Sequence, residues 1–485
     1  MVDHGPGRII FDVTTSMRWA GPPVGIVRVE RQLAFWALAN LSNARFAFFD
    51  PRRMAYCELN TDVRPFLLGE ATLETSGLPD PARPGRRKTD RAPAALRSLV
   101  LWIGRPRRTL LCWLEGIRLG VAAPRLSRFA DRLQMFLMSN KYRDIMFGPN
   151  GVRRPLLPYR MVLGKPIELI SGDTLVCAGT GWSHTNIGAI RHLKSFIKFR
   201  FVLLCYDLIP LLFPHFYSKR DVDMFRTYMN EALATADLIV VTSRKVEEDC
   251  QTYMAQHGIG GSKIAVAPLG FDVDGGNSRI PALPNGLVPG RFVLIVSTIE
   301  PRKGHRLLYN VWRRLTAEGI TQLLGFKLVF VGRRGWMVDS LLQEIRTDRV
   351  VSDQLLIMSG VDDDLLKALY RQAAFCVYPS RYEGYGLPIC EAFSHGKAVV
   401  ASSGGALPEL VQGLSPCLDP EDEEVWYKTL KQWIEYPDIR VPFEQAIRQQ
   451  FRHPTWSEAA AIFFEVCDFG ASRRLTSNRI ATKSS

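Results

Sequence analysis

The sequence predicts an α/β protein with two doubly wound parallel sheets, each at the core of its own domain. Short runs of Val, Ile and Leu alternate with helical patterns along most of the 485 residues. Continuous apolar runs of this kind are typical of parallel strands that are buried on both faces. The chain is also too long for one ordinary hydrophobic core, so we expect at least two domains.

The expected strands are apolar runs that end in small or polar residues. In the first half they lie at 8–16, 46–50, 174–179, 201–207, 238–243 and 263–270. In the second half they lie at 292–298, 327–332, 355–360, 375–380 and 398–403. The segments between them suit the crossover helices that parallel strands require. Each half therefore predicts one Rossmann-like domain, and the Gly- and Pro-rich stretch 271–290 predicts the boundary between them.

These patterns divide the chain into an N-terminal domain (1–280), a C-terminal domain (281–455), a C-terminal helix (456–470) and a disordered tail (471–485). Residues 81–160 interrupt the first domain with apolar patches cut by arginines, which predicts a basic helical insertion. They hold 18 Lys and Arg against 4 Asp and Glu, and so carry the whole formal net charge of +14. Arginines beside Trp-containing apolar stretches are typical of helices on anionic membranes. An insertion with solvated arginines is the alternative.

The overall composition, 47% apolar and 23% charged, is that of a globular enzyme. Nine cysteines are scattered singly, which indicates reduced thiols and argues against a disulfide framework or a zinc site. No run reaches the roughly 18 apolar residues of a membrane-spanning helix, and the N-terminus lacks a signal-peptide pattern. We expect a cytoplasmic protein, peripheral on the cytoplasmic face of the membrane if the insertion binds there.

The most informative stretch follows the expected strand at 375–380 and reads Glu-Gly-Tyr-Gly-Leu-Pro-Ile-Cys-Glu. Doubly wound sheets bind ligands at this end of a strand. Gly384 and Gly386 allow a tight turn, and the proline suits the first turn of a helix, whose free N–H groups attract a diphosphate. The carboxylates of Glu383 and Glu391 can accept hydrogen bonds from ribose and sugar hydroxyls.

This stretch resembles the Glu-x7-Glu signature of retaining glycosyltransferase family 4, whose GT-B fold has two Rossmann-like domains facing each other across a cleft. The resemblance covers most of residues 200–470 and the N-terminal domain in patches. It implies that Glu383 contacts the donor sugar, that Glu391 binds ribose, and that a loop meets sugar and phosphate. The loop residues are Gly384, Tyr385, Gly386 and Leu387. An ordinary strand–loop–helix unit with a capping glutamate is the alternative.

Two further strings resemble donor-site elements of the family. Ser-Thr-Ile-Glu-Pro-Arg-Lys-Gly resembles its phosphate-binding loop, which implies that Lys303 neutralises the leaving diphosphate. Many members have an arginine five residues earlier, where this chain has Thr298, so Arg302 is the candidate second cation. Ser-Gly-Val-Asp-Asp-Asp resembles the turn that flanks the nucleobase, at Val361. Its acidic run, 362–364, is interpreted as helix N-cap chemistry.

The first domain resembles the family at its opening strand, loop and helix, where Gly25 would approach the diphosphate. Arg28 and Glu30 of that helix are interpreted as ordinary first-turn residues. Cys-Tyr-Asp-Leu-Ile-Pro resembles the His-Asp-x-x-Pro element of the catalytic cleft. Asp207 is retained and Tyr206 replaces the histidine. His184 is an alternative cleft histidine, although a structural role is the favoured interpretation.

The resemblance implies a nucleotide-sugar co-substrate and no metal or other cofactor. Asp272 and Asp274 match an Asp-x-Asp metal motif only superficially, because they lie in the expected linker. Val-Gly-Arg-Arg-Gly-Trp at 331–336 is common among members with mannose-like donors. We therefore expect a mannosyltransferase that uses GDP-mannose or a related donor. The expected acceptor is a saccharide or lipid-linked saccharide in surface polysaccharide synthesis.

Other readings of the sequence stay open. A different GT-B enzyme, such as an epimerase or a phosphorylase, would share the donor motifs. A non-catalytic protein could use the basic segment to bind nucleic acid or a membrane. We expect no nucleic-acid partner, because the basic residues are interleaved with Trp, Leu and Met and form no exposed stripe. A scaffold subunit without activity fits poorly with the presence of both Glu383 and Glu391.

Overall fold

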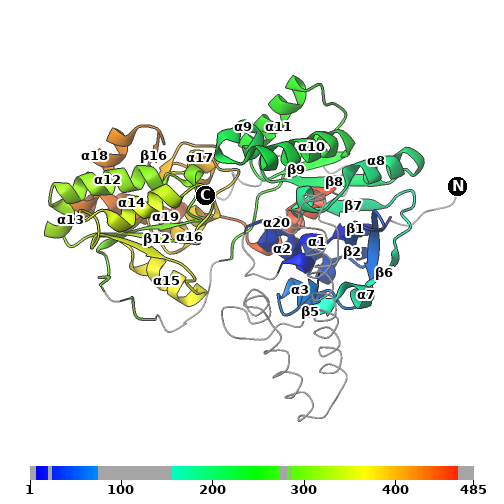
Figure 1. The fold of residues 1–485 in the computed structure, drawn as a ribbon, viewed down its shortest axis with the longest axis horizontal. Coiled ribbons are helices and arrows are strands. Elements are labelled where there is room, and N and C mark those ends of the chain that lie inside the picture. The colour runs from blue at the N-terminus through cyan, green and yellow to red at the C-terminus, as the bar shows by residue number, and fades with distance from the viewer. Residues whose placement is uncertain (1–6, 20–24, 75–155, 273–280, 285, 468–485) are drawn as a thin grey trace, which may run out of the picture.

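The computed structural model describes residues 7–19, 25–74, 156–272, 281–284 and 286–467. These residues form two lobes, each built around its own sheet (Figure 1). The expected tail 471–485 lies outside the described residues, and so does the expected insertion 81–160 except for its last five residues. β4 (Thr72–Glu74) pairs with β5 (Leu156–Pro158), so the chain leaves and re-enters the described part of the first lobe at neighbouring points.

The first lobe contains an eight-stranded sheet that is parallel over six strands. The order is β10 (Lys263–Val266), β9 (Leu238–Val241), β8 (Arg200–Cys205), β7 (Thr174–Cys177), β1 (Ile9–Asp12), β2 (Ala44–Asp50), β3 (Ala55–Leu59) and β6 (Leu163–Pro166). β3 is antiparallel to both of its neighbours. The chain builds outward from β1 in one direction and from β7 in the other. The carboxyl ends of β1 and β7 therefore form the switch point where such sheets bind ligands.

The second lobe contains a six-stranded sheet in which every pairing is parallel. Its order is β13 (Leu355–Met358), β12 (Lys327–Val331), β11 (Phe292–Val296), β14 (Phe375–Tyr378), β15 (Val399–Ser402) and β16 (Cys417–Leu418). Here the strand order reverses between β11 and β14. Each of the eleven apolar runs identified in the sequence contains all or most of a strand, and the prediction of two Rossmann-like sheets is confirmed.

Helices flank each sheet and connect its parallel strands (Figure 1). The longer helices of the first lobe are α2 (Ile26–Asn40), α8 (Ile187–Phe196), α10 (Lys219–Thr235) and α11 (Arg244–Gln256). Its short helices are α1 (Thr14–Arg18), α3 (Arg64–Leu67), α7 (Tyr159–Val162) and α9 (Ile209–Leu212). α8, α10 and α11 each begin at an Asn or Ser whose side chain accepts a backbone N–H of the first turn, so local capping sets where these helices start.

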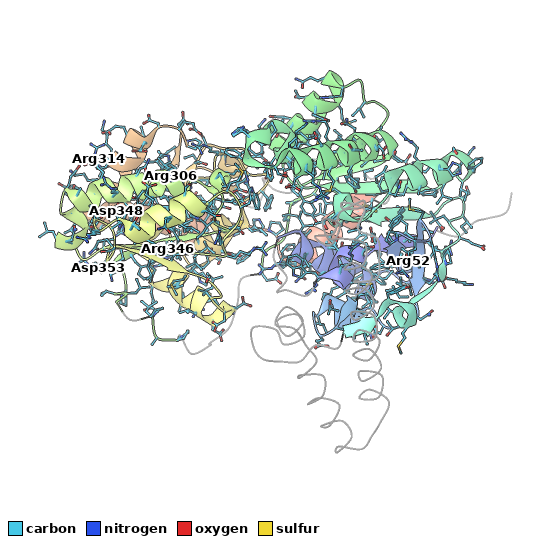
Figure 2. All side chains as sticks on the ribbon, viewed as in Figure 1. Arg52, Arg306, Arg314, Arg346, Asp348 and Asp353 are labelled. Atoms are coloured by element: carbon cyan, nitrogen blue, oxygen red, sulfur yellow. The ribbon has the colours of Figure 1, made fainter. Side chains whose placement is uncertain are left out.

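Ion pairs at the surface join some of the helices of the second lobe. These helices are α12 (His305–Ala317), α13 (Ile320–Leu323), α14 (Asp339–Thr347), α15 (Asp363–Gln372), α16 (Leu387–Ser394), α17 (Leu407–Val411), α18 (Glu423–Glu435) and α19 (Val441–Gln450). The labelled Arg306 and Arg314 of Figure 2 lie on α12, where they pair with Glu344 and Glu424. Acidic partners on neighbouring helices therefore offset these arginines.

The last described helix, α20 (Trp456–Cys467), returns to the first lobe (Figure 1). Phe464 on α20 stacks on Trp36 of α2, with 5.2 Å between the ring centroids. The side chain of Asp272 accepts a hydrogen bond from the backbone N–H of Trp456 at 3.0 Å, so this residue of the Asp-x-Asp motif caps α20. Asp274 lies outside the described residues. The chain thus crosses between the lobes twice.

Candidate functional site

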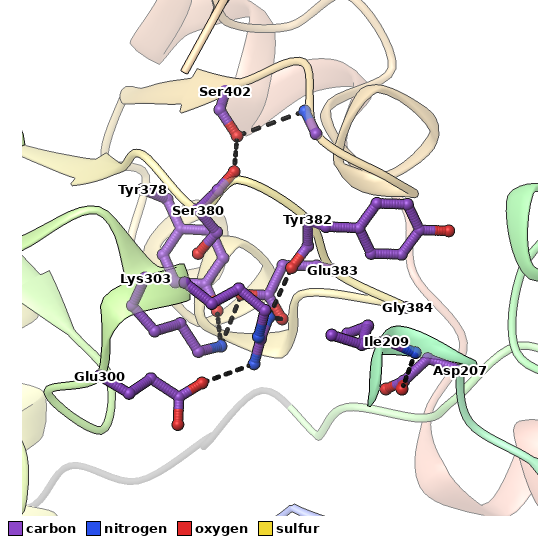
Figure 3. Close-up of polar contacts among 12 residues, drawn as sticks. Asp207, Ile209, Glu300, Lys303, Tyr378, Ser380, Tyr382, Glu383, Gly384 and Ser402 are labelled. Carbon is purple, nitrogen blue, oxygen red and sulfur yellow. Dashed lines mark hydrogen bonds and ion pairs between the residues drawn. The ribbon is translucent and has the colours of Figure 1, made fainter. Parts of the chain in front are cut away.

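The switch point of the second sheet brings together two loops that are far apart in sequence. The loop after β11 carries Lys303, and the loop after β14 carries Glu383 (Figure 3). Lys303 Nζ lies 2.5 Å from Glu383 Oε1 and donates a hydrogen bond to the Tyr378 hydroxyl at 3.1 Å. Arg302 Nη1 lies 2.8 Å from Glu383 Oε2. Both cations of the predicted phosphate loop therefore contact one carboxylate.

Arg302 is also bound by oxygens other than those of Glu383. Its Nη2 donates to Glu300 Oε1 at 2.8 Å, and its Nη1 donates to the Tyr382 carbonyl at 2.5 Å. The residue is only 9% exposed. Thr298, which stands where an arginine is common, is half-buried in the same loop. Arg302, Lys303, Glu300 and Glu383 together provide two cations and two carboxylates, so the ionised cluster carries no net charge.

These charges determine the protonation state of Glu383. Burial by itself would raise the pKa of this carboxyl group, but the nearby charges of Arg302 and Lys303 lower it to about 2. Burial and the charge of Arg302 lower the pKa of Lys303. Glu383 is therefore a carboxylate at neutral pH, able to accept hydrogen bonds and unable to donate them.

Gly384 places the Glu383 loop directly against the first lobe. Its carbonyl accepts hydrogen bonds from Thr242 Oγ1 at 3.1 Å and Ser243 Oγ at 3.0 Å. A Cβ atom at this position would lie 2.3 Å from the Tyr206 carbonyl oxygen and 2.8 Å from Asp207 Cβ. The contact between the lobes at this point therefore requires a residue without a side chain.

Asp207 lies beside Gly384, and its Oδ1 accepts the backbone N–H of Ile209 at 3.0 Å (Figure 3). Burial raises the pKa of Asp207, an effect that the charge of Arg302 opposes. The Tyr206 hydroxyl donates to the Ala178 carbonyl at 2.5 Å, inside the first lobe. The structure thus brings the predicted Asp207, Gly384 and Glu383 into one region.

His184 is a buried histidine of the first lobe, in agreement with the structural interpretation. Its Nε2 is 3.0 Å from Thr15 Oγ1, and its Nδ1 is 2.9 Å from Thr185 Oγ1. Burial, with a smaller contribution from the charge of Arg18, lowers its pKa to about 3. The imidazole is therefore neutral at physiological pH.

Glu391 lies on α16, which begins at Leu387 with Pro388 in its first turn, as the sequence predicts. Its Oε2 accepts a hydrogen bond from the Tyr370 hydroxyl at 2.8 Å. Its Oε1 lies 3.6 Å from Arg28 Nη1, which belongs to α2 of the first lobe. Burial raises the pKa of Glu391. Tyr370 follows the Val361 turn along α15, and no sequence signal marked it as a partner of Glu391.

The remaining predicted donor-site residues have different surroundings. Val361 is half-buried and packs against the core of the second lobe. The hydroxyl of Tyr385 donates to the Leu269 carbonyl at 3.1 Å and lies 2.8 Å from His453 Nε2. Tyr385 therefore contacts both segments in which the chain passes from one lobe to the other. Gly25 precedes α2 with φ of 52°, and Gly386, before α16, has φ of 126°.

Two interpretations of α2 need correction. Arg28 lies in the first turn but is not an ordinary residue there, because it reaches Glu391 of the other lobe. Glu30 is completely buried, and its Oε1 accepts the backbone N–H of Ser16 at 2.6 Å. Burial and the nearby Asp12 raise the pKa of Glu30 to about 8. Both side chains face groups supplied by other segments, which helix periodicity alone does not reveal.

A cavity of about 430 Å³ opens beside Asp207 and is lined by both lobes. Trp336 of the second lobe donates from its Nε1 to the Phe216 carbonyl at 2.7 Å, and its ring centroid lies 5.5 Å from that of Tyr217. Trp182 and Phe225 supply further aromatic lining. The string 331–336, which favours a mannose-like donor, contains Trp336 but does not predict this contact with the first lobe.

The acidic residues near the proposed nucleobase turn have a structural role. Asp362 caps α15 by accepting the backbone N–H of Leu365 at 2.8 Å, which confirms the N-cap interpretation. Within the described ranges, no group of three or more His, Cys, Asp or Glu residues is arranged to hold a metal ion. Across those same ranges, no helix is both long enough and apolar enough to cross a membrane.

Residues 286–450 match the family model described as glycosyl transferases group 1. The chain is 24% identical over 305 residues to the serotype-specific mannosyltransferase WbdA of Escherichia coli, covering 57% of this chain and 34% of that protein. It is 30% identical over 233 residues to the O-antigen chain mannosyltransferase B of E. coli, covering 46% and 58%. The chain thus spans about a third of the length of the WbdA relatives.

Among solved structures, the chain is similar to a sucrose-phosphate synthase from Thermosynechococcus elongatus, with a TM-score of 0.45, 17% identity and coverage of 61% of this chain and 72% of that one. It is also similar to an α,α-trehalose 6-phosphate synthase from Burkholderia multivorans, with a TM-score of 0.48, 15% identity and coverage of 60% and 70%. The two Rossmann-like lobes described above form the GT-B arrangement.

Proposed function

We propose that this chain is a retaining glycosyltransferase of family 4 that takes a sugar from a nucleotide-sugar donor held by the second lobe. The observation that carries the proposal is the convergence of Lys303 and Arg302 on Glu383 at the switch point between β11 and β14. Glu391 lies on the helix that follows the same loop. The family match over residues 286–450 covers all four residues.

The geometry supports a role for each group in transfer. Ionised Glu383 would accept hydrogen bonds from hydroxyls of the donor sugar, and Glu391 would accept those of ribose. Lys303 and the N–H groups at the start of α16 would stabilise the negative charge that develops on the departing diphosphate. Asp207 lies next to the Glu383 loop, where the transferred sugar would sit. Retention would follow from same-face substitution, in which the leaving phosphate assists deprotonation of the acceptor.

A mannose donor is the specific form of the proposal. The relatives named above are mannosyltransferases by name, and the string 331–336 is common in members with mannose-like donors. We propose GDP-mannose as donor and a saccharide or lipid-linked saccharide of a surface polysaccharide as acceptor. No metal ion would be needed, because protein groups supply the positive charge at the diphosphate.

The test is a panel of nucleotide sugars, scored for thermal stabilisation of the purified chain and for transfer to saccharide acceptors. GDP-mannose is expected to stabilise the protein and to yield an α-linked product. Conversion of the donor without any acceptor would favour an epimerase or a related GT-B enzyme instead. Failure of every nucleotide sugar to bind would overturn the proposal.

Contact with an anionic membrane surface is a further part of the proposal, and it rests on the sequence of residues 81–160. Each Lys or Arg near such a surface contributes about 1 kcal/mol, so engagement of a third of the 18 basic residues would suffice to hold the chain there. Flotation with anionic liposomes at low salt tests it. A variant with Arg86, Arg87, Arg105, Arg107 and Arg108 changed to Gln is expected to float less. Equal flotation of both proteins would exclude an electrostatic anchor.

A further inference from the structure

Arg28 and Glu391 face each other from opposite lobes. Arg28 is the third residue of α2, and its Nη1 lies 3.6 Å from Glu391 Oε1. The other oxygen of this carboxylate accepts the Tyr370 hydroxyl at 2.8 Å. The side chains of Arg28 and Glu391 are 33% and 17% exposed, so a ligand can reach both. Glu391 is thus held by one partner from each lobe.

The charges around Glu383 do not by themselves suit a nucleoside diphosphate. Such a ligand brings at least two negative charges, whereas the cluster of Arg302, Lys303, Glu300 and Glu383 is neutral when ionised. Arg302 is held by Glu300, Glu383 and the Tyr382 carbonyl, and turning it toward a phosphate would leave buried oxygens unpaired. An additional cation is therefore needed, and it must come from outside this cluster.

We infer that Arg28 is a donor-binding residue, contributed by the first lobe, that contacts the diphosphate of the nucleotide. This inference rests on the proposed function, in which Glu391 holds the ribose. The diphosphate is joined to the same ribose, so it lies within one side chain's reach of Glu391. The planar guanidinium group offers paired donors that match phosphate oxygens. When ribose hydroxyls bind Glu391, Arg28 leaves this carboxylate and pairs with the phosphates instead.

This role has a structural consequence. Arg28 and Glu391 form a direct ion pair between the lobes. With donor, the nucleotide takes the place of that pair and is held by Glu391 from one lobe and by Arg28 from the other. Donor binding is then coupled to the relative position of the lobes through charged side chains, whereas the Gly384 contact uses a backbone carbonyl.

The alternative is that Arg28 merely competes with ribose for Glu391. The two roles predict opposite effects of replacing Arg28 on the binding of a nucleoside diphosphate, so an experiment can separate them. If Arg28 holds the diphosphate, Arg28→Gln weakens the binding of GDP or UDP by roughly ten- to a hundredfold, the effect of losing a charge-assisted hydrogen bond. The same variant leaves guanosine or uridine binding unchanged or slightly tighter, because a nucleoside has no phosphate. Arg28→Lys keeps the positive charge but loses the paired donors of the guanidinium group. Its affinity for GDP or UDP should therefore fall between those of wild type and Arg28→Gln.

The experiment measures dissociation constants of the full chain for GDP and UDP by calorimetry, and for guanosine and uridine by saturation-transfer NMR. Arg226→Gln is the matched control, because Arg226 lies on α10 of the same lobe and pairs with Asp223 at the surface. Circular dichroism and melting temperature confirm that each variant is folded. A diphosphate-specific loss in Arg28→Gln, absent in Arg226→Gln, is the expected result.

Unchanged or tighter diphosphate binding by Arg28→Gln overturns the inference, and so does an equal weakening of diphosphate and nucleoside. Either result leaves the proposed function in place, because wild type still binds nucleotide. If wild type binds none of the four probes, the proposed function itself fails and the role of Arg28 fails with it.

Discussion

Lys303 and Glu383, 80 residues apart in sequence, form an ion pair of 2.5 Å across the switch point of the second sheet. Each comes from a loop at the carboxyl end of one of two adjacent parallel strands, β11 and β14. The pair is largely buried, with side chains 12% and 9% exposed, and a buried charge that loses its partner is costly. The proposed donor site and the stability of the second lobe therefore depend on the same contact.

Replacing Glu383 by Ala should abolish transfer and also destabilise the protein. The change leaves Arg302 and Lys303 buried side by side without their shared carboxylate, at a cost of about 3–5 kcal/mol. Turnover with GDP-mannose and urea unfolding measure the two effects. Glu421→Ala is the control, since Glu421 pairs with Arg381 at the surface and should change stability by less than about 1 kcal/mol. Normal turnover by Glu383→Ala would refute the site.

Glu30 should make the protein less stable as the pH rises. Its folded pKa, raised to about 8 from an ordinary 4.5, means that between these values the folded state holds a proton that the unfolded state has lost. Stability therefore falls with rising pH across this window, by roughly 3–4 kcal/mol between pH 5 and pH 8. Glu383, with a pKa lowered to about 2, changes protonation only at lower pH.

Glu30→Gln separates this effect from the other titrating groups. Glutamine keeps an oxygen that can accept the N–H of Ser16 and has no proton to lose. Urea unfolding of both proteins from pH 5 to pH 8 should show a steeper decline for wild type, with Glu30→Gln the more stable at pH 8. Parallel stability curves would show that Glu30 is ionised in the folded protein.

Removal of divalent metals should leave transfer intact. Lys303, the start of α16 and, by the inference above, Arg28 supply the positive charge at the diphosphate, so a metal ion has no necessary task there. Transfer from GDP-mannose is measured after dialysis against EDTA, with and without added Mn²⁺ or Mg²⁺. A strict requirement for either ion would contradict this arrangement and would direct attention back to Asp272 and Asp274.

The strands were predictable where their burial is uniform. The runs that became β8, β9 and β14 are buried along most or all of their length, and such strands carry a continuous apolar signal. β3 and β6 went unpredicted because they lie at one edge of the first sheet, are partly exposed and include polar residues. Their antiparallel pairing is what departs from a purely parallel sheet.

The site shows a similar division between local and tertiary information. The positions of Glu383, Gly384 and Lys303 follow from loops at strand ends, so a local motif was enough to find them. The partners of Arg28 and Glu30 were not predictable in this way. On α2 the apolar Val27 and Leu33 lie three residues before and after Glu30, on the same face of the helix, which was the available signal for burial. That Arg28 reaches Glu391 depends on how the two lobes meet, which no pattern within one helix contains.

The close contact between the lobes at Gly384 leads to a prediction about Gly384→Ala. A Cβ atom there would overlap the Tyr206 carbonyl at 2.3 Å and crowd Asp207 Cβ at 2.8 Å, and neither atom is the far end of a flexible side chain that could easily move aside. Gly384→Ala should therefore push the lobes apart, break the hydrogen bonds from Thr242 and Ser243 and reduce transfer at least tenfold, which corresponds to about 1.4 kcal/mol in the barrier.

Activity assays and the radius of gyration from small-angle scattering test this together. Gly260→Ala is the matched control, because no atom lies within 4 Å of its added Cβ. Gly384→Ala should show a larger radius and low activity, while each lobe keeps its folded circular dichroism signal because both sheets are untouched. Full activity with an unchanged radius would mean that the lobes do not meet at Gly384 in solution, and that the Glu383 loop works without the support of Tyr206 and Asp207.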